Sequence, residues 1–202
     1  MKICDSFITT IEKGNKHRDY CYQLTKQALC YCGLVPLTIR APLLTRYLAA
    51  ENSAKTDYYI LSDDDVIPMH PDTMINILEA IKSKPEIGML GLAYQRLLRK
   101  NDLGNKFKSD LGGGIYETES VKGIRVIKKG ILPIDKSDWE DLRNDYWERL
   151  TNKSISDNIV VAEMIRNKGY KVALDTNNYF WHIGEGYTTL LEERFNTYEV
   201  FK

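Results

Sequence analysis

Three consecutive aspartates, Asp63, Asp64 and Asp65, directly follow the apolar segment 58–61. The segment is short, aromatic and β-branched, and it predicts a buried strand. Adjacent carboxylates repel one another, so each one raises the cost of ionising the next. A hard divalent cation removes this cost, because Mg²⁺ or Mn²⁺ binds one or two carboxylates together with phosphate oxygens. For an isolated triplet, the alternative is an acidic turn with an aspartate as helix N-cap.

Segments of strand and helix character alternate around this triplet. The expected strands are 3–11, 34–39, 58–61, 87–93 and 170–175, and the expected helices are 20–32, 42–54, 72–83 and 157–168. A turn at Asn177–Asn178 and the segment 179–182 follow the last strand. Alternating strands and helices are typical of a layered α/β domain, in which ligands bind at the carboxyl edge of the sheet.

The middle of the chain is less regular. Residues 96–110 are polar, 121–131 predict a strand or hairpin, and 135–152 predict a partly helical flap rich in acidic and aromatic residues. No internal repeat or low-complexity linker interrupts the 202 residues, so we expect a single domain spanning 1–202.

Composition excludes several classes of protein. The 28 Lys and Arg residues balance the 28 Asp and Glu residues, which gives no overall basic footprint for nucleic acid. The basic stretch 96–108 is the best candidate for a local basic patch, and a solvated loop is the favoured interpretation of it. No stretch reaches the roughly 18 apolar residues of a transmembrane segment. Four cysteines without CxxC spacing and an early polar N-terminus favour reduced thiols and a cytoplasmic location.

Two parts of the sequence resemble family 2 glycosyltransferases. The segment 58–68, with Pro71 and a helix after it and the helix 45–54 before it, resembles the DxD region of that family. The tail Gly169-Tyr170-Lys171-Val172, Asp175-Thr176 and His182-Ile183-Gly184 resembles its C-terminal helix, strand and histidine. The resemblance covers roughly residues 40–95 and 155–187. It implies a GT-A-like, Rossmann-like fold of α/β/α layers around a mainly parallel sheet. Residues 1–95 would then form the nucleotide-sugar half and 96–202 the acceptor half.

The resemblance also assigns roles to the carboxylates. Asp63 and Asp65 would hold the metal and the donor diphosphate, with Asp64 beside the nucleotide. His182 would be a further metal ligand, whereas His70 and His17 lack a comparable context.

Three further residues are candidates for the donor or acceptor. Thr9 and Arg46 are expected near the base and phosphates, although both could be structural. Gly113, inside Gly112–Gly114, would allow close backbone approach to a sugar or acceptor, or else serve as a hinge.

The expected catalytic base is Asp157. The family has a Glu-Asp pair at the start of its C-terminal helix, and this chain has Ser156-Asp157-Asn158 instead. Counting back from Gly169 sets Asn158 under the family's aspartate, but an amide is no useful base, so a one-residue shift favours Asp157. A helix N-cap is the structural alternative for Asp157, and Asp141 is the reserve base.

The resemblance thus implies a metal-dependent glycosyltransferase with Mn²⁺ or Mg²⁺ and a nucleoside-diphosphate sugar, a UDP-sugar first, acting with inversion. The acceptor stays open: a glycan, lipid, protein, small molecule or modified nucleic acid. Two alternatives remain from other classes. One is a nucleotidyltransferase or other metal-dependent nucleotide enzyme. The other is a non-catalytic sugar-nucleotide-binding module, which Asn158 in place of an acid keeps open.

Overall fold

The computed structural model of the chain describes residues 4–10, 16–41, 45–95, 107–141 and 157–182. The helices are α1 (Lys16–Tyr31), α2 (Thr45–Ser53), α3 (Thr73–Lys82) and α5 (Asp157–Asn167), and residues 136–141 are also helical. The strands are β1 (Asp5–Thr10), β2 (Leu37–Arg40), β3 (Tyr58–Asp63), β4 (Val66–Pro68), β5 (Ile87–Gln95), β6 (Phe107–Asp110), β7 (Ile115–Thr118), β8 (Ile124–Lys128) and β9 (Lys171–His182).

The strands form one sheet in the order β2-β1-β3-β8-β5-β9-β7-β6, with β4 attached to β9. Strands β2, β1 and β3 are parallel to one another, and β5 is parallel to β9. Strand β8 is antiparallel to both β3 and β5, so β3 and β5 also run in the same direction. The mainly parallel central sheet expected from the sequence is therefore confirmed, with β8 as the reversed strand at its centre.

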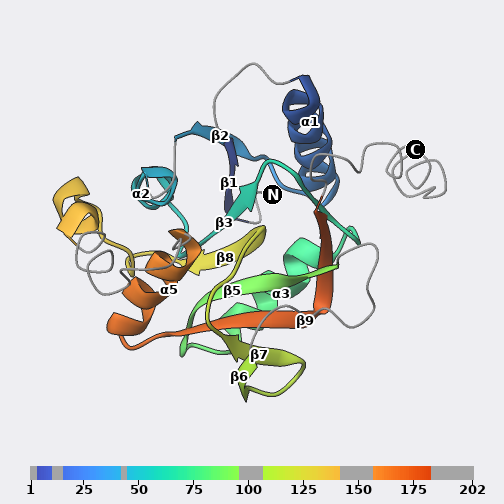
Figure 1. Cartoon of the computed structure of the whole chain (residues 1–202). Helices are drawn as coiled ribbons and strands as arrows, with labels where there is room; N and C mark the ends of the chain where they lie inside the picture. The colour runs from blue at the N-terminus through green and yellow to red at the C-terminus, as the bar shows by residue number, and fades with distance from the viewer. Residues whose placement is uncertain (1–3, 11–15, 42–44, 96–106, 142–156, 183–202) are drawn as a thin grey trace, which may run out of the picture.

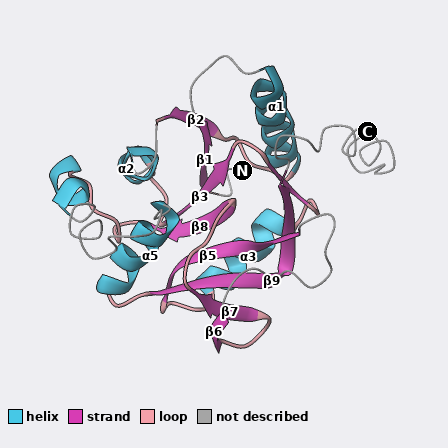
Figure 2. Ribbon diagram, in the orientation of Figure 1, coloured by secondary structure: helices cyan, strands magenta, loops and turns pink. Residues whose placement is uncertain are grey.

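Helices cover both faces of this sheet (Figure 1, Figure 2). Successive residues of each central strand contribute to opposite cores, as the period of two requires. Phe7 and Leu61 belong to the core shared with α2 and α5, whereas Ile8 and Ile60 belong to the core shared with α1 and α3. The result is the α/β/α arrangement predicted from the alternation of strands and helices. Among the described residues, no helix has the length and apolar character needed to cross a membrane.

The last strand differs from its prediction. Asn177 and Asn178 do not end a strand at Asp175, because β9 continues without interruption to His182. The register against β5 shifts between Asp175 and Tyr179, which leaves the two asparagines in a bulge. Asp175 accepts hydrogen bonds there from the Asn177 N–H and the Asn178 side chain, so the turn chemistry is local and the strand survives it.

The structure differs in part from the predictions for two other segments, 121–131 and 135–152. Residues 121–131 contain the single strand β8 and no hairpin of their own. A hairpin instead joins β6 and β7, which lie at the edge of the sheet beyond β9. In the flap expected over 135–152, residues 136–141 are helical and 142–156 lie outside the described residues.

Candidate active site

The aspartate triplet lies at the carboxyl end of β3. Thr9 is the register partner of Asp63 on the neighbouring strand β1. The chain then turns through Asp64 and Asp65 into β4, whose Val66 pairs with His182 at the end of β9. Strand β9 bends upward in its second half to reach this position (Figure 1). The sheet therefore brings together two sequence motifs separated by more than a hundred residues.

Asp63 is held by arginines and by a backbone amide. Its Oδ1 accepts from Arg125 Nη2 at 3.2 Å and from Arg46 Nη1 at 3.4 Å, and its Oδ2 accepts from the Gly123 N–H at 3.0 Å. Burial alone would raise the pKa of this carboxyl. The positive charges of Arg125 and Arg46 outweigh burial and hold the pKa of Asp63 below its ordinary value.

Arg125, which the sequence did not single out, lies beneath the triplet. Its side chain has no exposed surface. One guanidinium nitrogen donates to the Gly123 carbonyl oxygen at 2.9 Å, and the guanidinium carbon lies 5.0 Å from the centre of the Tyr47 ring. An arginine in the otherwise apolar strand Ile124–Ile127 was the available signal, because a buried charge requires a partner.

Asp64 is also occupied, by Arg18 of α1. Arg18 Nε donates to Oδ2 and Nη2 donates to Oδ1, both at 3.0 Å, in a two-pronged ion pair. The hydrogen bond to Asp64 raises the pKa of Arg18 above its ordinary value. The Asp64 side chain is only 1% exposed, and its ion pair with Arg18 ties α1 to the triplet. Its expected place beside the nucleotide stays a prediction.

Asp65 faces His182. The Asp65 Oδ2 and His182 Nε2 atoms are 3.2 Å apart, and both side chains are partly exposed, 22% for the aspartate and 48% for the histidine. The hydrogen bond that His182 donates to Asp65 is the largest influence on the pKa of His182, which it raises above its ordinary value. A carboxylate oxygen and an imidazole nitrogen at this spacing could bind one divalent ion together. The carboxylate suits either Mn²⁺ or Mg²⁺, whereas an imidazole ligand is more typical of a transition metal.

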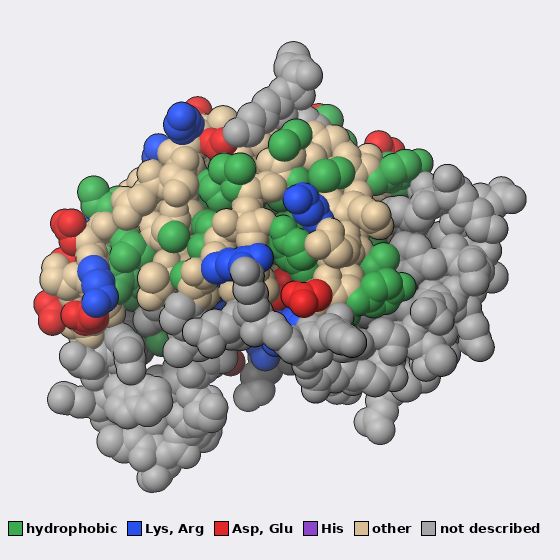
Figure 3. Space-filling view, turned by 90° about the horizontal axis from the view of Figure 1, so that it is seen from above, with side chains coloured by type: hydrophobic (Ala, Val, Ile, Leu, Met, Phe, Trp, Pro, Cys, Tyr) green, Lys and Arg blue, Asp and Glu red, His purple; other side chains and the backbone are tan. Residues whose placement is uncertain are grey.

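The proposed trio of metal ligands is less compact than the sequence suggested. Within the described ranges, no three His, Cys, Asp or Glu side chains are arranged to hold a metal ion. Asp63 is turned to Arg125 and Arg46, so the pair that fits an ion consists of Asp65 and His182. Viewed from the top of Figure 1, the described surface carries scattered acidic and basic side chains among hydrophobic ones (Figure 3).

Thr9 and Gly113 occupy different surroundings. The Thr9 hydroxyl is buried and donates to the Ser62 carbonyl oxygen at 3.2 Å, which supports the strand end beside Asp63. Gly113 lies in the β6–β7 turn with φ of +70°, and its carbonyl oxygen accepts from Asn177. The described contacts of Gly113 are thus with the bulge of β9 and not with the triplet.

The two base candidates lie at opposite ends of α5. Asp157 is the first residue of this helix, although its side chain lies outside the described residues. Its neighbour Asn158 is buried and accepts a hydrogen bond of 2.7 Å from the Tyr47 hydroxyl. Asp141 instead lines a cavity of about 410 Å³ beside the C-terminal end of α5. Asn158 and Asn167 are separated by roughly 14 Å of helix, so the two candidates are associated with different ends of α5.

Of the other two histidines, the structure describes the side chain of His70 alone, and it lies outside this cluster. His70 is exposed and lies 3.5 Å from Asp72. The His17 side chain lies outside the described residues.

The fold matches solved structures of glycosyltransferases and nucleotidyltransferases. A glycosyltransferase involved in the glycosylation of the major capsid of PBCV-1 aligns with a TM-score of 0.56 at 15% identity, over 96% of this chain and 100% of that chain. A putative glucose-1-phosphate thymidylyltransferase from Bacillus anthracis aligns with a TM-score of 0.53 at 9% identity, over 98% of each chain. GalNAc-T7, solved with UDP, GalNAc and Mn²⁺, aligns with a TM-score of 0.52 at 10% identity, over 90% of this chain and 43% of that chain.

These similarities establish a GT-A-like, nucleotide-sugar transferase type of α/β fold. No family model matches the sequence, and no curated protein sequence matches it either.

Proposed function

We propose that this chain is a metal-dependent glycosyltransferase that moves a sugar from a nucleoside-diphosphate sugar to an acceptor hydroxyl. The observation that carries the proposal is the Asp65–His182 pair at the carboxyl edge of the sheet. This edge is where open α/β sheets bind ligands. GalNAc-T7, which shares the fold, was solved with UDP and Mn²⁺. A UDP-sugar is accordingly the first donor to test. The cytoplasmic location expected from the sequence stays a prediction.

Each residue of the cluster has a role in this proposal. Asp65 and His182 would hold Mn²⁺ or Mg²⁺, which would supply positive charge to the diphosphate leaving group. Arg46, whose guanidinium is partly exposed beside Asp63, contributes positive charge at the phosphates. Asp63 is kept ionised and oriented by Arg125, and Asp64 anchors α1 through Arg18.

Asp157 is the proposed general base. It accepts the proton of the acceptor hydroxyl as that oxygen attacks the anomeric carbon. A single displacement of this kind inverts the configuration at that carbon. Asn158 is directed to Tyr47, which leaves Asp157 as the acid of the Ser-Asp-Asn segment.

The first test is a calorimetric titration of UDP and GDP with and without Mn²⁺. Wild-type protein should bind one nucleotide only when the metal is present. Asp65→Ala should abolish that binding, whereas Lys136→Ala, in an exposed ion pair with Glu140, should leave it unchanged. If neither nucleotide binds under any metal condition, the proposal is wrong.

A nucleotidyltransferase is the second candidate, because the thymidylyltransferase aligns about as well as the glycosyltransferase does. Incubation with a sugar 1-phosphate and a nucleoside triphosphate distinguishes the two. Release of pyrophosphate would indicate nucleotidyl transfer, and release of a nucleoside diphosphate from a nucleotide sugar would indicate glycosyl transfer. Nucleotide binding with neither product would identify a non-catalytic module.

A further inference from the structure

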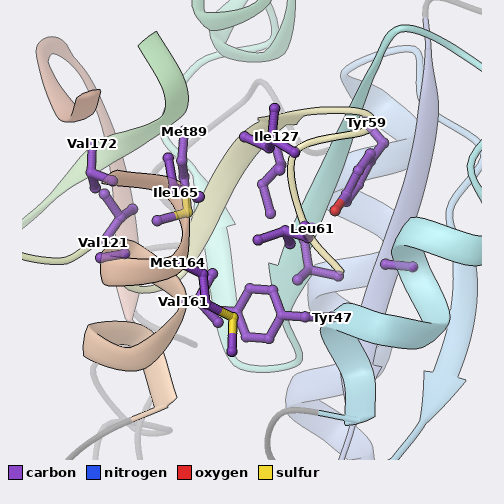
Figure 4. Packing of buried hydrophobic residues seen from close by; sticks show 14 of the residues in the cluster. Tyr47, Tyr59, Leu61, Met89, Val121, Ile127, Val161, Met164, Ile165 and Val172 are labelled. Carbon is purple, nitrogen blue, oxygen red and sulfur yellow. The ribbon is translucent and has the colours of Figure 1, made fainter. Parts of the chain in front are cut away.

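Tyr47 of α2 contacts both halves of the molecule. Its side chain is fully buried, and its hydroxyl donates to Asn158 Oδ1 at 2.7 Å across 111 residues of sequence. Figure 4 shows the ring extending from α2 toward Val161 and Met164 of α5. One aromatic side chain therefore anchors the first turn of α5, where the candidate base is located.

The faces of the same ring meet the cations that hold Asp63. The guanidinium carbon of Arg125 lies 5.0 Å from the ring centre and that of Arg46 lies 5.4 Å away. Cations within about 6 Å of an aromatic centroid are attracted by its electron-rich face. Both arginines also bind the Asp63 carboxylate, at 3.2 and 3.4 Å. Tyr47 thus connects Asp63 to Asn158 through contacts that are all buried or nearly so.

A third contact reaches the helical residues 136–141. The Trp139 ring stacks on the Tyr47 ring at 6.3 Å between centroids and an angle of 24°. The Trp139 indole N–H in turn donates to the Pro133 carbonyl oxygen at 2.7 Å. The buried side chain of Tyr47 therefore contacts the helical residues 136–141, α5 and the arginines that bind Asp63.

We propose that Tyr47 is a positioning residue that fixes the first turn of α5 relative to the aspartate triplet, and so links occupancy of the donor site to the placement of Asp157. This proposal rests on the proposed function. A phenylalanine fills the same volume in the core, so the hydroxyl is the part of Tyr47 that specifies where Asn158 lies. Loss of this hydrogen bond leaves the side-chain amide oxygen of Asn158 buried without the Tyr47 hydroxyl as its donor.

Hydrogen–deuterium exchange of peptides within 157–167 tests the link without any acceptor. In the free protein, Tyr47→Phe should make exchange in the first half of α5 about fivefold faster, the change expected from one lost buried hydrogen bond. In wild type, UDP with Mn²⁺ should slow that exchange. In Tyr47→Phe, UDP should still bind and the slowing should be lost.

Tyr59→Phe is the matched control. Tyr59 is also fully buried, and its hydroxyl donates to Glu51 Oε2 at 2.8 Å within the same core, away from α5. This variant loses one buried hydroxyl without touching Asn158. Equal effects of Tyr47→Phe and Tyr59→Phe on α5 would overturn the proposal, because they would reflect general loosening of the core.

Asn158→Ala provides a second variant from the other side of the hydrogen bond. It should reproduce the faster α5 exchange, and the double variant with Tyr47→Phe should add nothing further. Additive effects would contradict the proposed link. If wild type binds no nucleotide, the proposed function fails, while the exchange of the free proteins still decides whether Tyr47 positions α5.

Discussion

The guanidinium of Arg125 lies fully buried against the partly exposed carboxylate of Asp63, with Nη2 and Oδ1 3.2 Å apart. Asp64 is paired with Arg18, and Asp65 lies within hydrogen-bond distance of His182. The repulsion expected among three adjacent carboxylates is therefore relieved by the protein itself. The exposed side of the Asp65–His182 pair is therefore where we propose that a metal ion binds.

Arg125→Met should destabilise the protein by about 3 kcal/mol, because it leaves the Asp63 carboxylate without its buried partner. The free energy of unfolding, measured by urea titration, checks this. Lys136→Met, which removes an exposed pair with Glu140, should cost less than about 0.5 kcal/mol. The double variant Arg125→Met/Asp63→Leu should recover part of the loss. A cost for Arg125→Met no larger than that for Lys136→Met would show that the buried pair contributes little.

The same pair predicts a pH dependence with a definite sign. The pKa of Asp63 is lowered in the folded protein, so the ionised form stabilises the fold. This contribution is complete above the unfolded value of about 3.9 and is lost as the pH falls through the lower folded value. The stability difference between wild type and Arg125→Met should therefore be constant near neutral pH and shrink below about pH 4. Urea titrations at a series of pH values measure it, and a difference that grows on acidification would contradict the assignment.

The fold was largely predictable because the information that specifies it is local. Apolar runs such as 58–61 and the helical spacing within 72–83 determine which faces are buried, and the order of elements then selects an α/β/α arrangement. The turn predicted at Asn177–Asn178 was wrong, because a local turn and a bulge within a strand use the same side-chain hydrogen bonds. Strands β6 and β7 have four residues each, which is too short for an apolar alternation by which to recognise them.

The site was predictable only in part. The triplet and His182 are recognisable by their neighbours in sequence, and the pairing of β4 with β9 brings Asp65 and His182 together. Arg18 and Arg125 are far from these motifs along the chain and reach them only through tertiary packing. Tyr47 lies in the helix before the triplet, but its contacts with Arg125 and Asn158 also arise only from tertiary packing. The sequence of the triplet does not indicate which carboxylates form ion pairs with arginines. These ion pairs determine which carboxylate is available to a metal ion.

Gly123→Ala should destabilise the protein and disturb the site together. Gly123 has φ of +73°, and an added Cβ would lie 2.1 Å from the buried ring of Phe180. Left-handed backbone costs roughly 1–2 kcal/mol for a residue with a side chain, and overpacking adds about 1–3 kcal/mol. The Gly123 N–H also donates to Asp63, so the carboxylate should shift with the backbone.

Gly169→Ala is the control for that substitution. Gly169 has φ of +82° at the end of α5, and an added Cβ there would meet no atom within 4 Å. It should therefore cost only the backbone part, about 1–2 kcal/mol. Equal losses for the two variants in urea unfolding would show that contact with Phe180 is unimportant.

Metal affinity should rise with pH through the titration of His182. The hydrogen bond to Asp65 raises the pKa of His182 above its ordinary value near 6.5, and only the neutral imidazole binds a metal ion. Manganese binding, measured by calorimetry in the presence of UDP, should strengthen as the pH passes through and above about 6.5. Below this range the protonated imidazole excludes the ion, and affinity should fall up to about tenfold per pH unit.

Asp65→Asn should return the pKa of His182 toward 6.5. An NMR titration of the His182 ring protons measures this pKa, and the His182→Gln variant assigns their signals. An Asp65→Asn protein whose His182 titrates as in wild type would remove the basis for both effects.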